Sequence, residues 1–237
     1  MKKVFVIGAH GKVARHFADI VAESNDLSEK AMIRKEEQIP FFKDRQIETV
    51  LLDLAATEED ELAKAMSGSD AVIFSAGAGG SGTDNIFTID LDGAIKAMTA
   101  AEKAGIKRFI MVSTFRTGRE WMQQDTIRSY TIAKNYADEW LKNRTKLDWT
   151  IIHPGVLIDE PGTGKVKVGG VGEVADIDLT ATDNAFSNTD LQVPRQDIAR
   201  VLEAALGADA TIKKEIEVIQ GDTPISEAIQ TIYLGFA

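Results

Sequence analysis

Tyr130 and Lys134 lie four residues apart in the segment YTIAK and form the pair most suited to chemistry in this sequence. Residues at i and i+4 share one face of a helix, so the phenol and the ammonium can point toward the same site. A phenol is a weak acid at neutral pH, and a neighbouring ammonium stabilises its phenolate form. Tyr130 could therefore exchange a proton with the oxygen of a carbonyl or alcohol substrate.

Two hydroxyl residues, Ser113 and Thr114, precede this pair at the end of the apolar segment RFIMVST. Either hydroxyl could hydrogen-bond to the substrate oxygen that Tyr130 protonates and polarise it. The chain has only three tyrosines, yet a lysine four residues after one of them can still arise by chance. The pair gains weight from its position, because it follows a strand that ends in hydroxyls and lies on a predicted helix.

A glycine-rich segment, GAHGKVA, follows the first apolar segment and precedes the first helical pattern. Its first glycine permits a tight turn with positive φ, and its second lets the backbone approach a phosphate closely. The next helix brings free N–H groups and a positive dipole end to the same place. Alanine suffices at the third position, Ala14, where the helix only has to pack closely on the strand. Two glycines after a strand also occur in plain turns, but the context predicts dinucleotide binding by Gly8, His10, Gly11, Lys12 and Val13.

The end of the second strand-like segment, KAMIR, indicates which dinucleotide would bind. NAD sites usually carry an acidic residue here, which bonds the ribose 2′-hydroxyl. This chain has Arg34 and Lys35 instead, and two cations suit the 2′-phosphate of NADP(H). A solvated basic turn is the alternative. We expect NADP(H) to be preferred over NAD(H).

Residues at two further strand ends complete the expected cofactor site. An acidic side chain that closes the third segment could meet the adenine edge, and a small-residue backbone after the fourth could lie along the cofactor. These residues are Asp53, Leu54, Ser75, Ala76 and Gly77. No metal site is expected, because the chain has no cysteine and its three histidines lack ligand spacing.

Short segments dense in Val and Ile recur along the chain and are mostly apolar throughout, which is typical of strands buried on both faces. They are KVFVIG, KAMIR, TVLLDL, AVIFSAG, RFIMVST, WTIIHP and EIEVIQ. Helical patterns lie between them, around residues 13–21, 91–101 and 198–206. Strands that alternate with helices predict an α/β fold, a doubly wound parallel sheet with helices on both faces.

The length of 237 residues predicts a single domain over residues 1–237. Its least regular stretch, residues 155–194, is either a small substrate-covering insertion or a long surface loop. The motif PGTGK in this stretch resembles a phosphate-binding P-loop. However, Asp159 stands in place of the first P-loop glycine and Val166 in place of the metal-binding hydroxyl, so we expect a turn.

Composition limits the partners that we expect. A net charge of −10 argues against nucleic acid, whose phosphates require a basic surface. No apolar stretch is long enough to span a bilayer, and the N-terminal residues do not form a secretion signal. The absence of cysteine suits a reducing cytoplasm. We expect a cytoplasmic monomer or small homo-oligomer that acts on a small-molecule substrate.

Several segments together resemble the short-chain dehydrogenase/reductase superfamily, in its atypical NAD(P)-binding branch with NmrA-like relatives. They are GAHGKVA, the basic residues after the second strand, IDLDGA, KRFIMVST, YTIAK, IIHPGVLIDEPGTGKV and EVIQGDTPISEAI. The resemblance implies a Rossmann-like domain that binds NADP(H). It also implies a reductase triad of Thr114, Tyr130 and Lys134, with Lys134 also holding the nicotinamide ribose.

The chain departs from this superfamily at two places. Relatives commonly show Arg-Pro-Gly after the sixth strand, whereas this chain has His153, Pro154 and Gly155, which we expect near the nicotinamide. Asp90 stands where many members carry an asparagine that supports the catalytic lysine through water. The second departure puts the full proton relay in question.

Three functions remain open. The first is an NADP(H)-dependent oxidoreductase acting on a small carbonyl or alcohol. The second is an epimerase or dehydratase that uses transient hydride transfer, and such enzymes usually carry a larger substrate subdomain. The third is a non-catalytic NADP(H)-sensing protein. The Tyr130 and Lys134 pair favours the enzymes, because a sensor needs no proton donor.

Overall fold

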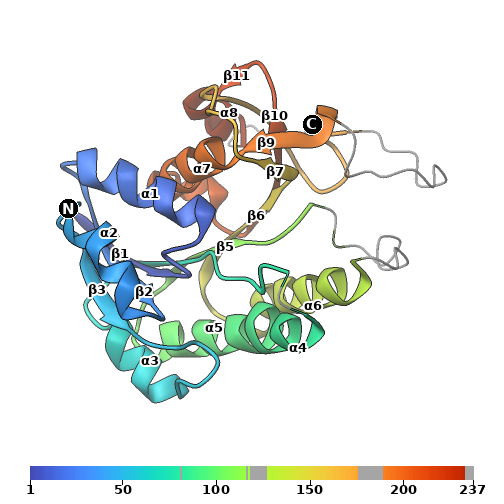
Figure 1. The fold of residues 1–237 in the computed structure, drawn as a ribbon. Helices are drawn as coiled ribbons and strands as arrows, with labels where there is room; N and C mark the ends of the chain where they lie inside the picture. The colour runs from blue at the N-terminus through green and yellow to red at the C-terminus, as the bar shows by residue number, and fades with distance from the viewer. Residues whose placement is uncertain (81, 116, 118–126, 176–188, 233–237) are drawn as a thin grey trace.

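A central sheet of mostly parallel strands organises the molecule in the computed structural model, which describes residues 1–80, 82–115, 117, 127–175 and 189–232 (Figure 1). The sheet order is β11-β8-β10-β6-β5-β4-β1-β2-β3. The parallel strands are β1 (Lys2–Ile7), β2 (Leu27–Ile33), β3 (Glu48–Leu51), β4 (Ala71–Phe74), β5 (Arg108–Val112), β6 (Asp148–Pro154) and β10 (Lys214–Gln220). Strands β8 (Lys165–Gly169) and β11 (Thr223–Pro224) extend the sheet in antiparallel pairing.

Helices cover both faces of this sheet, as Figure 1 shows. One face packs against α1 (Lys12–Glu23), α7 (Arg195–Gly207) and α8 (Ile225–Thr231). The other face packs against α3 (Glu59–Met66), α5 (Ala94–Lys103) and α6 (Arg128–Arg144). Shorter elements connect them: η1 (Glu36–Gln38), α2 (Ile39–Lys43), α4 (Thr83–Asn85), the π-helix η2 (Ile86–Gly93) and η6 (Asp209–Thr211). The α/β fold with a doubly wound sheet is therefore confirmed.

Strand β1 illustrates why these sequences form buried strands. Val4 and Val6 point into one apolar core and Phe5 and Ile7 into the other, and all four side chains are buried. Alternation along the strand therefore sends an apolar side chain to each helical layer, which explains the continuous apolar run.

The direction in which successive strands are added to the sheet reverses between β1 and β4, which are paired neighbours. Strands β2 and β3 lie on one side of β1, and β4, β5 and β6 lie on the other. The turns after β1 and β4 therefore open at the same sheet edge, where strand order reverses. Ligands of doubly wound sheets bind at such a switch point.

The irregular stretch 155–194 has more regular structure than its composition suggests. Strand β8 belongs to the central sheet, and β7 (Val156–Ile158) pairs with β9 (Gln192–Pro194), which follows η5 (Thr189–Leu191). Residues 176–188 lie outside the described part of the chain. A substrate-covering role for this stretch stays a prediction. None of the helices in the described ranges is long and apolar enough to cross a bilayer.

The PGTGK motif forms a turn that binds a carboxylate of the same chain. The backbone N–H groups of Thr163 and Gly164 donate to the two oxygens of Asp197 over 2.8 and 2.9 Å. Asp197 is buried at the start of α7 and also pairs with Arg200 at 3.1 Å. These N–H groups are therefore occupied, in agreement with the expectation of a turn.

Candidate cofactor and catalytic site

The glycine-rich turn between β1 and α1 has the geometry that its sequence predicts. Gly8 has a φ of +77°, and a Cβ there would lie 2.6 Å from the backbone nitrogen of Ala76. The Gly11 N–H donates to the Gly8 carbonyl over 2.8 Å, and α1 begins at the next residue. No side chain within the described residues caps the start of α1, so its first N–H groups face the space above the turn.

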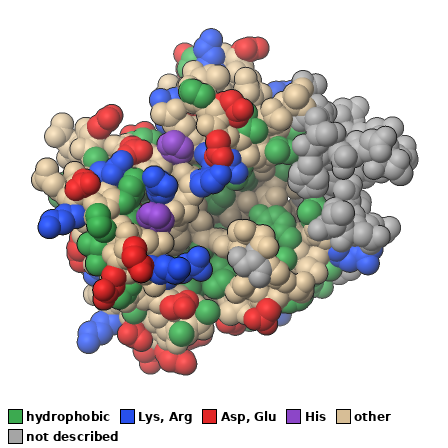
Figure 2. Space-filling model, viewed as in Figure 1, with side chains coloured by type: hydrophobic (Ala, Val, Ile, Leu, Met, Phe, Trp, Pro, Cys, Tyr) green, Lys and Arg blue, Asp and Glu red, His purple; other side chains and the backbone are tan. Residues whose placement is uncertain are grey.

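A cavity of about 430 Å³ lies above this turn, at the carboxyl ends of β1 to β4. Its volume falls in the range of small-molecule sites. Many of the expected cofactor residues line it: Gly8, His10, Gly11, Arg34, Asp53, Leu54, Ser75, Ala76 and Gly77. Figure 2 shows this face of the molecule hollowed near its centre, with histidine and basic side chains beside the hollow.

Arg34 and Lys35 follow β2 at the edge of this cavity. Their backbone N–H groups donate to the Gln38 side-chain oxygen over 3.0 and 3.2 Å, which closes the turn. Both side chains are exposed, and neither forms an ion pair with any described residue. Arg34 therefore lines the cavity without an ion-pair partner among the described residues, and Lys35 lies next to it in the turn.

His10 forms part of the cavity wall. Its ring contacts Phe41 edge-on, with the ring centroids 5.7 Å apart, and lies 6.2 Å from Phe42. Burial and the nearby Arg15 guanidinium lower the pKa of His10 below its ordinary value. His10 therefore offers a neutral ring to a ligand at neutral pH.

Other expected cofactor residues lie outside the described lining of the cavity. Lys12 pairs with Asp159 at 2.6 Å, and Val13 is buried in the core beneath α1. Lys35 is not among the residues that line the cavity, although its backbone belongs to the turn at the cavity edge. Pro154 and Gly155 are buried at the end of β6, and a Cβ on Gly155 would overlap the Leu191 carbonyl oxygen. Close packing at the end of β6 therefore explains why residue 155 is glycine.

Lys134 is buried, and an ion pair with Asp90 connects it to the segment after β4 that lines the cavity. Its ammonium lies 3.0 Å from Asp90 Oδ1 and donates to the Val112 carbonyl over 3.3 Å. Asp90 comes from the π-helix η2, and its Oδ2 accepts the Ala78 N–H over 2.8 Å. A Cβ on Gly77 would lie 3.0 Å from Asp90 Oδ1, so glycine leaves room for this carboxylate. Asp90 thus contacts Lys134 directly and joins it to the cavity wall.

Lys134 is held in its charged form. Burial opposes the charge, but Tyr130 and the Asp90 carboxylate outweigh it and raise the pKa of Lys134 above its ordinary value. The ammonium lies 5.7 Å from the centre of the Tyr130 ring, one helical turn earlier on α6. The expected pair is therefore brought together on one face of that helix.

The two candidate hydroxyls differ in their surroundings. Ser113 is buried, and its hydroxyl donates to Asp138 over 2.8 Å. Thr114 is half-buried, and its hydroxyl makes no hydrogen bond to another described residue. Of the two, Thr114 has the hydroxyl that a substrate oxygen could use.

Sequence reasoning missed several residues of this region. Asn85 and Ile89 line the cavity from α4 and η2, and Gln38 closes the basic turn. Asp138 could have been found, because it follows Lys134 by four residues on the same helix face. Glu215 lies on β10, whose sequence KEIEVIQ alternates polar and apolar residues at its start, so nothing in the sequence distinguishes it.

Comparison with known proteins gives the family. A family model described as NAD(P)H-binding matches residues 8–209, which include the glycine turn, the cavity and both candidate catalytic residues of α6. The chain belongs to this NAD(P)H-binding family.

Three similar proteins cover nearly the whole chain. The uncharacterized sugar epimerase YhfK of Bacillus subtilis is 40% identical over 97% of this chain and 100% of its own length. The UPF0659 protein YMR090W of Saccharomyces cerevisiae is 37% identical over 97% and 98%. The solved structure of the oxidoreductase ylbE from Lactococcus lactis is 31% identical, covers 99% of this chain and 98% of its own, and superimposes with a TM-score of 0.82.

These matches confirm that the chain belongs to an NAD(P)-binding, Rossmann-like family in which similar proteins are named as an epimerase and an oxidoreductase, whereas the NmrA-like subgroup stays a prediction. The residues present also fit a dinucleotide. The Gly8 turn has no space for a side chain, and the cavity joins it to the strand ends where a dinucleotide would lie. The family and the geometry therefore agree on NAD(P) binding.

Proposed function

We propose that this protein is an NADP(H)-dependent oxidoreductase that acts on a small carbonyl or alcohol substrate. The observation that carries the proposal is the buried ion pair of Lys134 with Asp90. It fixes the ammonium one helical turn from Tyr130 and, through the Ala78 N–H, next to the cavity wall. A charged lysine in this position is expensive to bury and suits a tyrosine that moves protons.

The roles of the residues follow from their positions. The glycine turn and the start of α1 would hold the pyrophosphate, and Arg34 and Lys35 would contact a 2′-phosphate. A bound nicotinamide would supply or accept the hydride. Tyr130 would donate a proton to the substrate oxygen or accept one from it, and Thr114 would hydrogen-bond to that oxygen. Lys134 would stabilise the phenolate that remains when Tyr130 has given up its proton.

The Tyr130→Phe variant tests this proposal. Phenylalanine keeps the ring packing and removes only the hydroxyl, so kcat for NADPH-dependent carbonyl reduction should fall by about 10²–10⁴-fold while the NADPH Kd stays unchanged. Small aldehydes, ketones and quinones are screened by the loss of NADPH absorbance. Tyr136→Phe is the matched control, because Tyr136 is exposed on the same helix, and it should retain full activity. Equal turnover by Tyr130→Phe and wild type would rule out the proton-donor role.

Epimerisation is the second candidate, because a relative 40% identical to this chain is named a sugar epimerase. The same cofactor site and the same tyrosine would serve that reaction, with the hydride returned to the substrate. Incubation with nucleotide sugars would then give an epimer with no net consumption of NADPH. Tight NADPH binding without either reaction would favour a sensing protein instead.

A further inference from the structure

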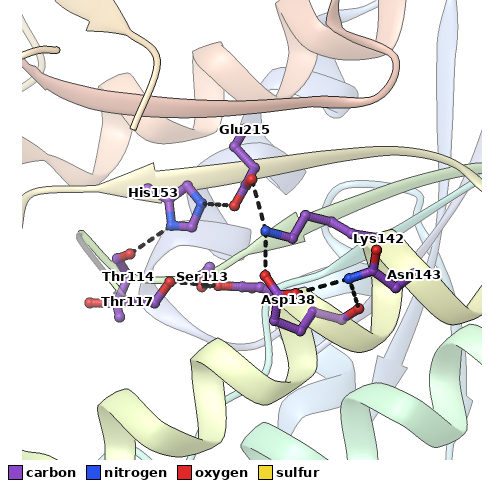
Figure 3. Close-up of polar contacts among 9 residues, drawn as sticks. Ser113, Thr114, Thr117, Asp138, Lys142, Asn143, His153 and Glu215 are labelled. Carbon is purple, nitrogen blue, oxygen red and sulfur yellow. Dashed lines mark hydrogen bonds and ion pairs between the residues drawn. The ribbon is translucent and has the colours of Figure 1, made fainter. Parts of the chain in front are cut away.

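A partly buried polar cluster lies at the end of β5, next to the proposed site (Figure 3). It joins the segment that follows β5 to β6, β10 and α6. Its members are Ser113, Thr114, Thr117, Asp138, Lys142, His153 and Glu215. The mechanism above uses only the Thr114 hydroxyl among them, so the cluster needs its own explanation.

His153 lies at the centre of this polar cluster, with only 1% of its surface exposed. One ring nitrogen, Nδ1, lies 2.8 Å from the Thr114 carbonyl oxygen, and the other, Nε2, lies 3.3 Å from Glu215 Oε1. A carbonyl oxygen can only accept a hydrogen bond, so Nδ1 must carry a proton.

The Glu215 carboxylate makes the second ring nitrogen a donor as well. Its Oε2 accepts from the Lys142 ammonium over 3.0 Å, and an ionised carboxylate can only accept. Although burial works against ionisation, hydrogen bonds from His153 and Lys142 lower the pKa of Glu215 below its ordinary value. The two ring nitrogens of His153 therefore face two acceptors, which requires an imidazolium.

Two carboxylates near the ring support this assignment, Glu215 on β10 and Asp138 on α6. Lys142 on α6 is a cation, but its ammonium binds the other oxygen of Glu215. Glu217 on β10 is buried in register with His153. Burial disfavours the charged ring, but Glu215, Asp138 and the Thr114 carbonyl outweigh it and raise the pKa of His153. Burial also raises the pKa of Asp138 to about 6, so its carboxylate is largely ionised at neutral pH.

The segment after β5 is held from two sides. His153 binds the Thr114 carbonyl, while the hydroxyls of Ser113 and Thr117 donate to Asp138 Oδ2 over 2.8 and 3.2 Å. These contacts fix the backbone that carries the Thr114 side chain. The direction of the Thr114 hydroxyl therefore depends on the contact to His153.

We infer that His153 is a positioning residue, an imidazolium that is anchored on Glu215 and holds the Thr114 backbone in place. The inference rests on the proposed function in one respect, since the Thr114 hydroxyl is there the group that binds the reacting oxygen. When His153 loses one proton, one of its two oxygen partners loses its donor. The alignment of Thr114 is then weakened.

Two substitutions separate the contacts of His153. The asparagine amide nitrogen can take the place of Nδ1, so His153→Asn retains the hydrogen bond to Thr114. The glutamine amide reaches the place of Nε2, so His153→Gln retains only the contact to Glu215. His16→Gln, on α1 and away from the polar cluster, is the control.

Imidazole nitrogen NMR spectra test the charge directly, because the chain has only three histidines. His153, assigned by its loss in His153→Asn, should keep protons on both nitrogens to a higher pH than an ordinary histidine. In Glu215→Gln, the glutamine side-chain amide can donate a hydrogen bond to an unprotonated Nε2. The neutral His153 ring should therefore appear at a lower pH than in wild type. A His153 ring in wild type that is already neutral at about pH 7 would overturn the inference.

The Phe115 amide resonance reports the hydrogen bond to the preceding Thr114 carbonyl. It should shift in His153→Gln, remain near its wild-type position in His153→Asn, and not move in His16→Gln. Equal shifts in both His153 variants, or none in either, would contradict the positioning role. These spectra need no substrate, so they decide the role even if wild type turns over nothing and the proposed function fails.

Kinetics measure the consequence for the reaction. His153→Gln should lower kcat by about tenfold or more with the NADPH Kd within about twofold, because misplacement of a contact group affects the chemical step. His153→Asn should lose clearly less activity, and His16→Gln none. An equal loss of kcat in both His153 variants would show that His153 has only a structural role.

Discussion

Buried ionisable side chains in this protein differ in whether they have a partner. Asp90 and Lys134 are both buried and form an ion pair at 3.0 Å, so each has a partner of opposite charge. Glu29 on β2 is equally buried, but neither carboxyl oxygen has a hydrogen-bond partner among the described residues. Burial raises the pKa of Glu29 to about 8, so it is a neutral acid in the folded protein at neutral pH.

The stability of the protein should therefore fall between about pH 5 and pH 8 because of Glu29. The folded state keeps the Glu29 proton up to about pH 8, whereas the unfolded chain releases it near its ordinary value of 4.5. The unfolded state binds fewer protons in this window, so the free energy of unfolding decreases as pH rises. Glu29→Gln removes this contribution.

Relative to wild type, the Glu29→Gln variant should gain about 2 kcal/mol or more in free energy of unfolding between pH 5 and pH 8. Urea denaturation at both pH values measures the difference. Glu37→Gln, at an exposed position, is the control and should leave the pH dependence as in wild type. A Glu29→Gln profile parallel to wild type would mean that the Glu29 carboxyl is not held neutral.

At the scale of elements, the turn between β1 and α1 gives its two glycines different tasks. Gly8 has a positive φ, and a Cβ there would collide with the backbone of Ala76. Gly11 has an ordinary φ of −66°, and a Cβ there would lie 3.0 Å from the Gly8 carbonyl oxygen and 3.7 Å from that of Ser75. The fold therefore requires glycine at the first position, whereas we propose that the close approach of a ligand requires it at the second.

Matched valine substitutions should separate these tasks. Gly8→Val should lower the melting temperature strongly, because a β-branched residue at positive φ is strained and its side chain has no space. Gly11→Val should keep the far-UV circular dichroism and most of the thermal stability but abolish dinucleotide binding. Thermal melts and calorimetric titration with NADPH measure both effects. Normal NADPH affinity in a folded Gly11→Val protein would show that the pyrophosphate lies elsewhere.

The strands of the parallel sheet were predictable because each is a short apolar run between polar turns, and the glycine turn was predictable from its position. Other features depend on contacts between distant segments. His153 meets partners 39 and 62 residues away, which no spacing rule relates to it. Strand β8 alternates exposed and buried residues at the edge of the sheet, so its sequence lacked the apolar run of the inner strands. The π-helix η2 likewise carries no sequence signal that separates it from the α-helix that follows.

At the scale of the whole molecule, a net charge of −10 repels an anionic dinucleotide, so local cations must hold it. Lys12 and Arg195 lie close by but both pair with Asp159 at 2.6 Å. Arg34 and Lys35 form no ion pair with a described residue. Arg34, which lines the cavity, and Lys35 next to it are therefore our candidates for contacting a phosphate group at the cavity edge.

Calorimetric titration of wild type and Arg34→Ala with NADPH and NADH tests the central claim most directly. A bidentate contact of Arg34 to the 2′-phosphate is worth about 1.5–3 kcal/mol. Wild type should therefore bind NADPH about tenfold or more tightly than NADH, and Arg34→Ala should lose this advantage while its NADH affinity is unchanged. Equal affinity of wild type for the two dinucleotides, or a loss of both in Arg34→Ala, would contradict the account.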